Sequence, residues 1–267
     1  MKSVASMLRL DDRVALVTGA AGHLGLSCCE ALAEQGARIV VCDRELPACE
    51  ARASDLARRF GVATRPLAID LRDGEAATVA IEFALQEFGS LDVLVNNAAY
   101  TGASGVPGYA VPFDEQKVEA WDAALHVNLT APFLLAQRAR AALSAHSRGS
   151  IINVGSIYGV VGPQMALYEG TSMGNPAAYG ASKGGLVQLT RYLATVMAPS
   201  VRVNCISPGG IERGQPEPFR RAYRERTPLG RMATEEDIKS AFAYFASDAS
   251  AYVTGTNLCI DGGWSAW

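Results

Sequence analysis

The sequence predicts an α/β fold, a doubly wound parallel sheet with helices on both faces. Two observations predict it. Short, nearly continuous apolar runs alternate with longer amphipathic segments from residue 13 onward, and glycines follow several of the amphipathic segments. Parallel strands need crossover helices between them, and these crossovers are right-handed, so the alternation gives a doubly wound layout. The 267 residues carry no internal repeat or linker, so we expect one domain over 1–267.

Three strand–helix pairs are expected in the first part of the chain. The strands are short apolar runs at 13–18, 38–42 and 63–69. The helices are amphipathic segments at 24–35, 47–60 and 74–88. A glycine follows each of these helices, as is typical of a helix C-terminus: Gly36, Gly61 and Gly89.

The second part of the chain continues the alternation. A fourth strand at 91–95 leads to a long helix at 114–145, which we expect to be interrupted near 128–132 because that stretch ends in a proline. The remaining strands are expected at 150–154, 201–206 and 257–260, and the remaining helices at 179–197 and 235–247. Residues 1–10 are expected to form an N-terminal lead-in, and the arginine-rich segment 212–227 a substrate lid.

The composition argues against several classes of function. Charged residues make up 19% of the chain, the net charge is -3, and no basic stripe appears, so we expect no nucleic-acid partner. The apolar runs are too short for a membrane span and no cleavable leader is evident, so we expect a cytoplasmic protein. The six cysteines form neither Cys-x-x-Cys nor a metal-like cluster with the three histidines, which favours reduced thiols and no metal.

Tyr179 and Lys183 form the most informative pair in the sequence. They are four residues apart at the start of a predicted helix, so their side chains share one face, one turn apart. A neighbouring ammonium group favours the phenolate and is expected to lower the pKa of the tyrosine. A phenol tuned in this way suits reversible proton transfer to a carbonyl or alcohol oxygen.

A glycine-rich turn between the first strand and the first helix, residues 18–25, suits a dinucleotide. Glycines let the backbone approach a pyrophosphate at a helix N-terminus, where the amides and the helix dipole favour negative charge. Asp43 ends the second strand, where a carboxylate accepts from ribose hydroxyls and repels a 2′-phosphate. This favours NAD over NADP, although the adjacent Arg44 would suit a phosphate and leaves NADP open.

Six motifs in this order resemble the classical short-chain dehydrogenase/reductase family. They are residues 18–25, residues 96–99, Ser156, Tyr179-x-x-x-Lys183, Asn204-x-x-x-Pro208-Gly209 and the ending 255–263. The resemblance extends from about residue 10 to residue 264. It implies a Rossmann-like sheet, a nicotinamide cofactor, hydride transfer with a small-molecule alcohol or ketone, and a homo-oligomer, either a dimer or a tetramer.

The resemblance also implies residue roles. Tyr179 corresponds to the general acid/base, Lys183 to the group that supports it, Ser156 to the hydroxyl that holds the substrate oxygen, and Asn128 to the helix-kinking residue of a proton relay. The substrate would contact Ser156, Tyr158 and Tyr179. Residues expected at the cofactor are Gly19, Gly22, His23, Leu24, Gly25, Asp43, Asp70, Asn97, Ala98, Tyr179, Lys183, Pro208, Gly209 and Ile211.

The chain departs from the family pattern in three places. His23 stands where a glycine is common, and Glu212-Arg213 replaces a threonine after the Pro-Gly motif. The third departure is the separation of Ser156 and Tyr179, 23 residues (179 minus 156), which implies a polar insertion beside both hydroxyls. Tyr168 lies in it but lacks a lysine four residues later, so it does not compete with Tyr179.

These observations favour an oxidoreductase that acts on the CH–OH group of a polar substrate, such as a sugar or another hydroxyl-rich molecule, with NAD. Two alternatives stay open. One is a 3-oxoacyl-thioester reductase that uses NADPH, and the other is a dinucleotide sensor or scaffold without catalysis. The presence of all four candidate proton-relay residues speaks against the sensor.

Overall fold

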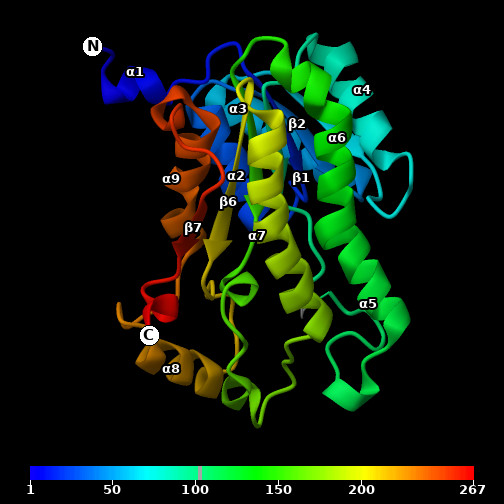
Figure 1. Ribbon diagram of the computed structural model, residues 1–267, viewed down its shortest axis with the longest axis vertical. Coiled ribbons are helices and arrows are strands. Elements are labelled where there is room, and N and C mark those ends of the chain that lie inside the picture. The colour runs from blue at the N-terminus through cyan, green and yellow to red at the C-terminus, as the bar shows by residue number, and fades with distance from the viewer. Residues whose placement is uncertain (102–103) are drawn as a thin grey trace.

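The computed structural model describes residues 1–101 and 104–267. Within these residues, seven parallel strands form one sheet in the order β3–β2–β1–β4–β5–β6–β7 (Figure 1). The strands are β1 (Val14–Thr18), β2 (Arg38–Asp43), β3 (Thr64–Ala68), β4 (Val93–Asn96), β5 (Gly149–Val154), β6 (Val201–Pro208) and β7 (Asn257–Ile260). The chain runs outward from β1 to β3 and then returns to β4, so the order reverses between β1 and β4. A crevice at such a reversal is the usual ligand site of a doubly wound sheet.

Helices cover both faces of the sheet, as Figure 1 shows. One face packs against α2 (His23–Glu34), α3 (Leu46–Phe60) and α9 (Glu235–Ala246). The other face packs against α4 (Ala76–Phe88), α6 (Ala131–Ser144) and α7 (Ala177–Met197). This confirms the predicted doubly wound architecture, and the strands and these helices begin and end within about three residues of the predicted bounds.

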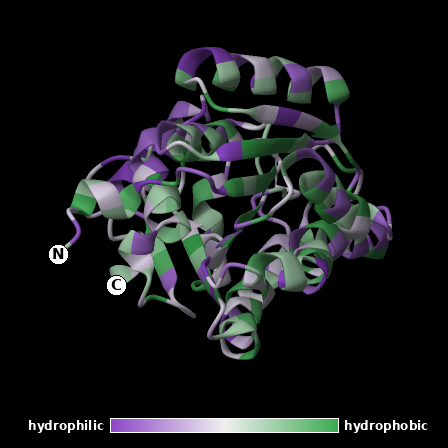
Figure 2. Ribbon diagram, turned by 90° about the horizontal axis from the view of Figure 1, so that it is seen from above, coloured by the Kyte–Doolittle hydropathy of each residue, from purple (hydrophilic) through white to green (hydrophobic). Residues whose placement is uncertain are grey.

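The two layers of helices explain the continuous apolar strands. In β1, Ala15 and Val17 belong to the core beneath α2, α3 and α9, whereas Val14 and Leu16 belong to the core beneath α4, α6 and α7. Successive strand side chains point to opposite faces, so a strand covered on both faces must be apolar at every position. In Figure 2 the hydrophobic colour accordingly gathers on the strands between the helical layers.

The predicted long helix is interrupted where the sequence indicated. Helix α5 (Val118–Leu125) continues through a π-helical turn, His126–Thr130, into α6. Within the turn lies Asn128, and Pro132, which has no N–H to donate to the preceding turn, is the second residue of α6. The extra residue in the turn re-aims the chain and places the Asn128 side chain in the wall behind the cavity described below.

In the part of the chain that the structure describes, two α-helices lie in segments for which no helix was predicted. The lead-in contains the short α1 (Val4–Leu8), which buries none of its residues. The arginine-rich segment folds largely as α8 (Glu217–Arg226), which buries Phe219 and Tyr223. Of its arginines, Arg221 is exposed, and the others are half-buried. The charge of the segment hid this amphipathic pattern. Among the described residues, no helix combines the length and the apolar character needed to cross a bilayer.

Candidate active site

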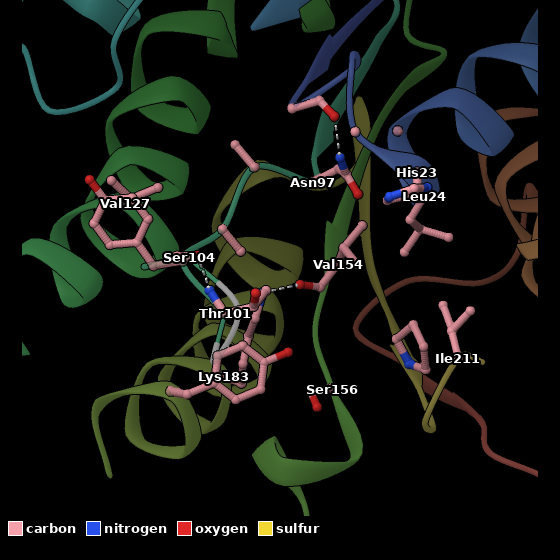
Figure 3. A pocket seen from close by; sticks show the side chains of 18 of the residues that line it. His23, Leu24, Asn97, Thr101, Ser104, Val127, Val154, Ser156, Lys183 and Ile211 are labelled. Carbon is pink, nitrogen blue, oxygen red and sulfur yellow. Dashed lines mark hydrogen bonds between the residues drawn. The ribbon is translucent and has the colours of Figure 1, made fainter. Parts of the chain in front are cut away.

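A cavity of about 900 Å³ opens at the carboxyl ends of β1, β4, β5 and β6 (Figure 3). Every residue that the sequence assigned to the cofactor or to the substrate lines this cavity. Of the four residues assigned to catalysis, Ser156, Tyr179 and Lys183 line it, whereas Asn128 lies behind its wall with 1% of its surface exposed. The fold therefore gathers the predicted residues at one place, and their individual roles remain predictions.

The glycine turn leaves no room for side chains at its two ends. Gly19 has φ +65°, and a Cβ there would lie 2.8 Å from the Cα of Ala98. A Cβ on Gly25 would lie 2.0 Å from the carbonyl oxygen of Gly19. Gly22 caps α2 in an extended conformation, and the first-turn amides of a helix have no acceptor within it. These features fit a pyrophosphate at the N-terminus of α2.

Asn97 holds this turn in place. Its Nδ2 donates to the carbonyl oxygens of Thr18 at 3.0 Å and Gly19 at 2.9 Å, and its backbone N–H donates to the Thr18 hydroxyl (Figure 3). The Asn97 amide group is thus already used to support the turn. His23, the first residue of α2, is exposed at the turn beside Leu24, so its side chain does not fill the space that the glycines leave.

Two carboxylates line the cavity near the carboxyl ends of β2 and β3. Asp43, at the end of β2, accepts from the backbone N–H of Ala21 at 2.9 Å and from that of Arg44 at 2.8 Å. These bonds fix the carboxylate beside the glycine turn, where it suits ribose hydroxyls. Asp70 accepts from the backbone and the side chain of Arg72, and the hydrogen bond with that guanidinium lowers its pKa. Asp70 therefore also shapes its own loop.

Ser156 and Tyr179 lie together in the cavity, where the nicotinamide is predicted to bind. Ser156 follows β5 and is 6% exposed, and Tyr179 lies in the first turn of α7. Burial raises the pKa of Tyr179, while hydrogen bonding with Ser156 and the charge of Arg213 lower it by smaller amounts. The net pKa is above the ordinary value, so the predicted depression is not present in the protein by itself. Removal of the phenol from water outweighs the favourable neighbours.

Lys183 lies beneath Tyr179 and is 2% exposed. Its Nζ lies 5.8 Å from the centre of the Tyr179 ring and donates to the carbonyl oxygen of Val154 at 2.6 Å (Figure 3). Burial lowers the pKa of Lys183 to about 8. An amine with this pKa is still mostly protonated near neutral pH, so Lys183 keeps a positive charge beside Tyr179.

Asn128 connects three parts of the site. Its Oδ1 accepts from the backbone N–H of Tyr100 at 2.7 Å, and its Nδ2 donates to the Tyr100 carbonyl at 3.1 Å and to the Ser182 hydroxyl at 3.0 Å. The loop after β4, the π-helical turn and α7 are thereby held together one residue from Lys183. The structure gives Asn128 a positioning role, and a proton relay through it remains a prediction.

Residues outside the predicted set also reach the cavity. Arg213 lies where the family pattern has a threonine after the Pro-Gly motif. Its side chain lines the cavity and pairs with Glu235 at 2.7 Å. Tyr168 and Asn175, from the insertion, line the wall near Tyr158. The length of the insertion indicated that it shapes the pocket. It did not indicate which side chains point inward, because loop residues follow no period that assigns them to a face.

Comparisons with known proteins agree with this geometry. A family model described as enoyl-(acyl carrier protein) reductase matches residues 19–265. The chain is 36% identical over 263 residues to cis-4-hydroxycyclohexanecarboxylate dehydrogenase of Sinomonas cyclohexanicum, covering 96% of this chain and 97% of that protein. It is 35% identical over 269 residues to D-threitol dehydrogenase of Mycolicibacterium smegmatis, covering 98% and 96%.

A solved structure is similar over the same extent. NADPH-dependent 3-quinuclidinone reductase from Rhodotorula rubra superposes with a TM-score of 0.88 at 31% identity, covering 100% of this chain and 96% of that chain. The matches extend over the glycine turn, over Tyr179 and Lys183, and over β7 alike. The chain therefore belongs to the short-chain dehydrogenase/reductase family of nicotinamide-dependent oxidoreductases that act on CH–OH groups.

Proposed function

We propose that this chain is an NAD-preferring dehydrogenase that interconverts a secondary alcohol and a ketone in a small, hydroxyl-rich molecule. The observation that carries the proposal is that the glycine cradle and the Ser156–Tyr179 pair open into one cavity. Hydroxyl and amide groups of the insertion support a polar substrate. The names of the relatives point to a ring alcohol and to an open-chain polyol, which agrees with a substrate of this class.

In the proposed reaction, the chain's own residues handle the proton and the substrate oxygen. A bound nicotinamide supplies the acceptor or the donor of the hydride. Tyr179 Oη takes the hydroxyl proton during oxidation and returns it during reduction. The Ser156 hydroxyl holds the substrate oxygen and stabilises its developing charge. The nearby charge of Lys183 favours the phenolate of Tyr179.

The preference for NAD rests on Asp43. Its carboxylate is fixed beside the glycine turn by the Ala21 and Arg44 amides, so it would meet a 2′-phosphate as a like charge. Arg44 is exposed and could accompany a phosphate, so NADP is the less favoured cofactor rather than an impossible one. The measurement is the dissociation constant of each reduced cofactor from fluorescence titration, with NADH expected to bind more tightly than NADPH.

A second candidate function is the reduction of a 3-oxoacyl thioester with NADPH. The description of the matching family model favours it, because it names an acyl-carrier substrate. The polar insertion and Asp43 speak against it. Acetoacetyl-CoA with NADPH separates the two, since the proposed alcohol dehydrogenase should turn it over at least 10-fold more slowly than its best polyol with NAD.

The test of the proposed function is a panel of polyols, sugars and cyclic alcohols, read as NADH absorbance, for the unaltered protein and for Tyr179→Phe. We expect turnover of at least one alcohol, a loss of roughly 100- to 10,000-fold in Tyr179→Phe, and little change in NADH binding. Equal rates in the two proteins would show that Tyr179 is not the proton-transfer group. An unaltered protein inactive on the whole panel would refute the proposed substrate class.

We also propose that the chain forms a homo-oligomer through its long helices. Helices α5 and α6 keep large apolar side chains partly exposed, Trp121 at 37% and Phe133 at 39%. Partly exposed aromatic side chains on helices suit a contact with a second copy.

A further inference from the structure

The insertion between Ser156 and Tyr179 brings a linked set of polar groups to the cavity wall. The hydroxyl oxygens of Tyr158 and Tyr168 lie 2.9 Å apart, and Asn175 Nδ2 donates to the Tyr168 hydroxyl at 3.3 Å. All three side chains are half-buried and line the cavity. The backbone N–H of Tyr158 also donates to Ser156 Oγ at 3.2 Å, so the set begins beside the candidate catalytic serine.

The geometry leaves the two phenols with one hydrogen to donate. Tyr158 and Tyr168 carry two phenolic hydrogens, and one of them forms the bond between the two oxygens. Asn175 Nδ2 is itself a donor, so it cannot accept the other hydrogen. Within residues 1–101 and 104–267, no further acceptor is bonded to either hydroxyl. Whichever phenol donates to its partner, the other phenol keeps an O–H that is free to donate to another acceptor.

Tyr158 is held as a neutral hydroxyl. Burial raises the pKa of Tyr158 well above its ordinary value, and the neighbouring Tyr168 raises it further. Tyr158 therefore stays protonated at any pH at which the protein would work, which suits recognition and not proton transfer. The Tyr168 ring also packs against Phe219 of α8, with ring centres 5.5 Å apart, and this contact limits its rotation.

We propose that Tyr168 is a specificity-determining residue that, with Tyr158, donates a hydrogen bond to a second oxygen of the substrate, a neutral hydroxyl near the reacting carbon. Asn175 positions Tyr168 for this contact. The inference rests on the proposed dehydrogenase function and adds that a diol is preferred to the matching mono-alcohol. A neutral hydroxyl fits better than a carboxylate, because Arg213 on this side of the cavity is already paired with Glu235.

The test compares cyclohexanol with the 1,2-, 1,3- and 1,4-cyclohexanediols in the unaltered protein and in Tyr168→Phe. Phenylalanine keeps the ring and its contact with Phe219 but removes the hydroxyl. We expect the unaltered protein to favour at least one diol over cyclohexanol by about 10-fold or more in kcat/KM. Tyr168→Phe should abolish most of this preference and leave cyclohexanol turnover and NADH binding within about 2-fold.

Two further variants complete the design. Tyr252→Phe removes the hydroxyl of a fully exposed tyrosine and should change neither rate. Asn175→Leu keeps both phenols but removes the amide that positions Tyr168, so it should lower the diol preference by a smaller factor without lowering cyclohexanol turnover. It also serves as the second variant if Tyr168→Phe does not fold.

The possible outcomes separate this inference from the function on which it rests. A diol preference that persists in both Tyr168→Phe and Asn175→Leu would overturn the inference and leave the dehydrogenase proposal standing. Equal turnover of cyclohexanol and every diol by the unaltered protein would do the same. Inactivity of the unaltered protein on these alcohols and on the polyols and sugars of the panel above would overturn the proposed function itself.

Discussion

Lys183 holds its charge in a buried position with little compensation. Its ammonium group donates to the Val154 carbonyl, and among residues 1–101 and 104–267 no carboxylate pairs with it. A buried charge of this kind weakens the folded protein. The sequence predicted that Lys183 would lie beside Tyr179, because helical spacing fixes that. It did not predict the raised pKa of Tyr179, because burial depends on the whole fold.

The free-energy cost of burying the charged Lys183 ammonium group leads to a prediction about stability. Lysine titrates near 10.5 in the unfolded chain and near 8 here, so the folded protein binds fewer protons between these pH values. Stability must then rise with pH from about 8 to about 10.5, and the full penalty acts below pH 8. We expect Lys183→Met to raise Tm at pH 7 by a few degrees, from roughly 1–2 kcal/mol after the lost hydrogen bond is counted.

The Tm measurement has an internal control and a matched variant. The gain in Lys183→Met should shrink as the pH rises from about 8 toward 10.5, because Lys183 is then neutral in the folded protein and no longer bears the cost of a buried charge. Lys239→Met on α9 removes a lysine that pairs with Glu30 and Glu34, so it should lower Tm slightly. A Lys183→Met protein that melts below the unaltered one at pH 7 would contradict the argument.

At the scale of elements, the glycine turn joins β1 and α2 into one structural unit. The third residue of α2 is Gly25, and it allows the helix to approach the end of β1 closely enough to aim its N-terminus into the cavity. The sequence predicted this unit well, because glycine spacing, an apolar strand and a helix start all agree. It did not predict α8, because five arginines between 212 and 227 concealed the buried faces of Phe219 and Tyr223.

Gly25→Ala tests the unit directly. The new Cβ would lie 2.0 Å from the Gly19 carbonyl oxygen, so α2 must move away from the turn. We expect a loss of about 3 kcal/mol in the free energy of unfolding and NADH binding at least about 10-fold weaker. Gly74→Ala is the matched control, because a Cβ there meets nothing within 4 Å. Normal NADH affinity in Gly25→Ala would mean that cofactor binding does not depend on the close approach of α2 to the glycine turn.

For the whole molecule, the order of the strands determines where the site forms. The chain reverses direction across the sheet between β1 and β4, and both cradle and catalytic residues follow strands near that reversal. This much was predictable, because alternating periodicity and the handedness of crossovers leave few topologies. The inward-facing side chains of the 159–176 segment were not predictable, since Tyr168 is fixed by contacts with Tyr158, Asn175 and Phe219 and not by any local pattern.

The proposed homo-oligomer gives the last prediction, at the scale of the assembled molecule. Phe133 on α6 is 39% exposed, and a charge at the centre of an apolar contact would have to be buried without a partner. We expect Phe133→Arg to reduce the mass in solution to that of a smaller species, measured by light scattering, while Tm of the separated chain stays measurable. Leu46→Arg on α3, where Leu46 is 46% exposed on the opposite helical layer, should leave the mass unchanged. An unchanged mass in Phe133→Arg would place the contact elsewhere, and a single-chain mass for the unaltered protein would refute the oligomer altogether.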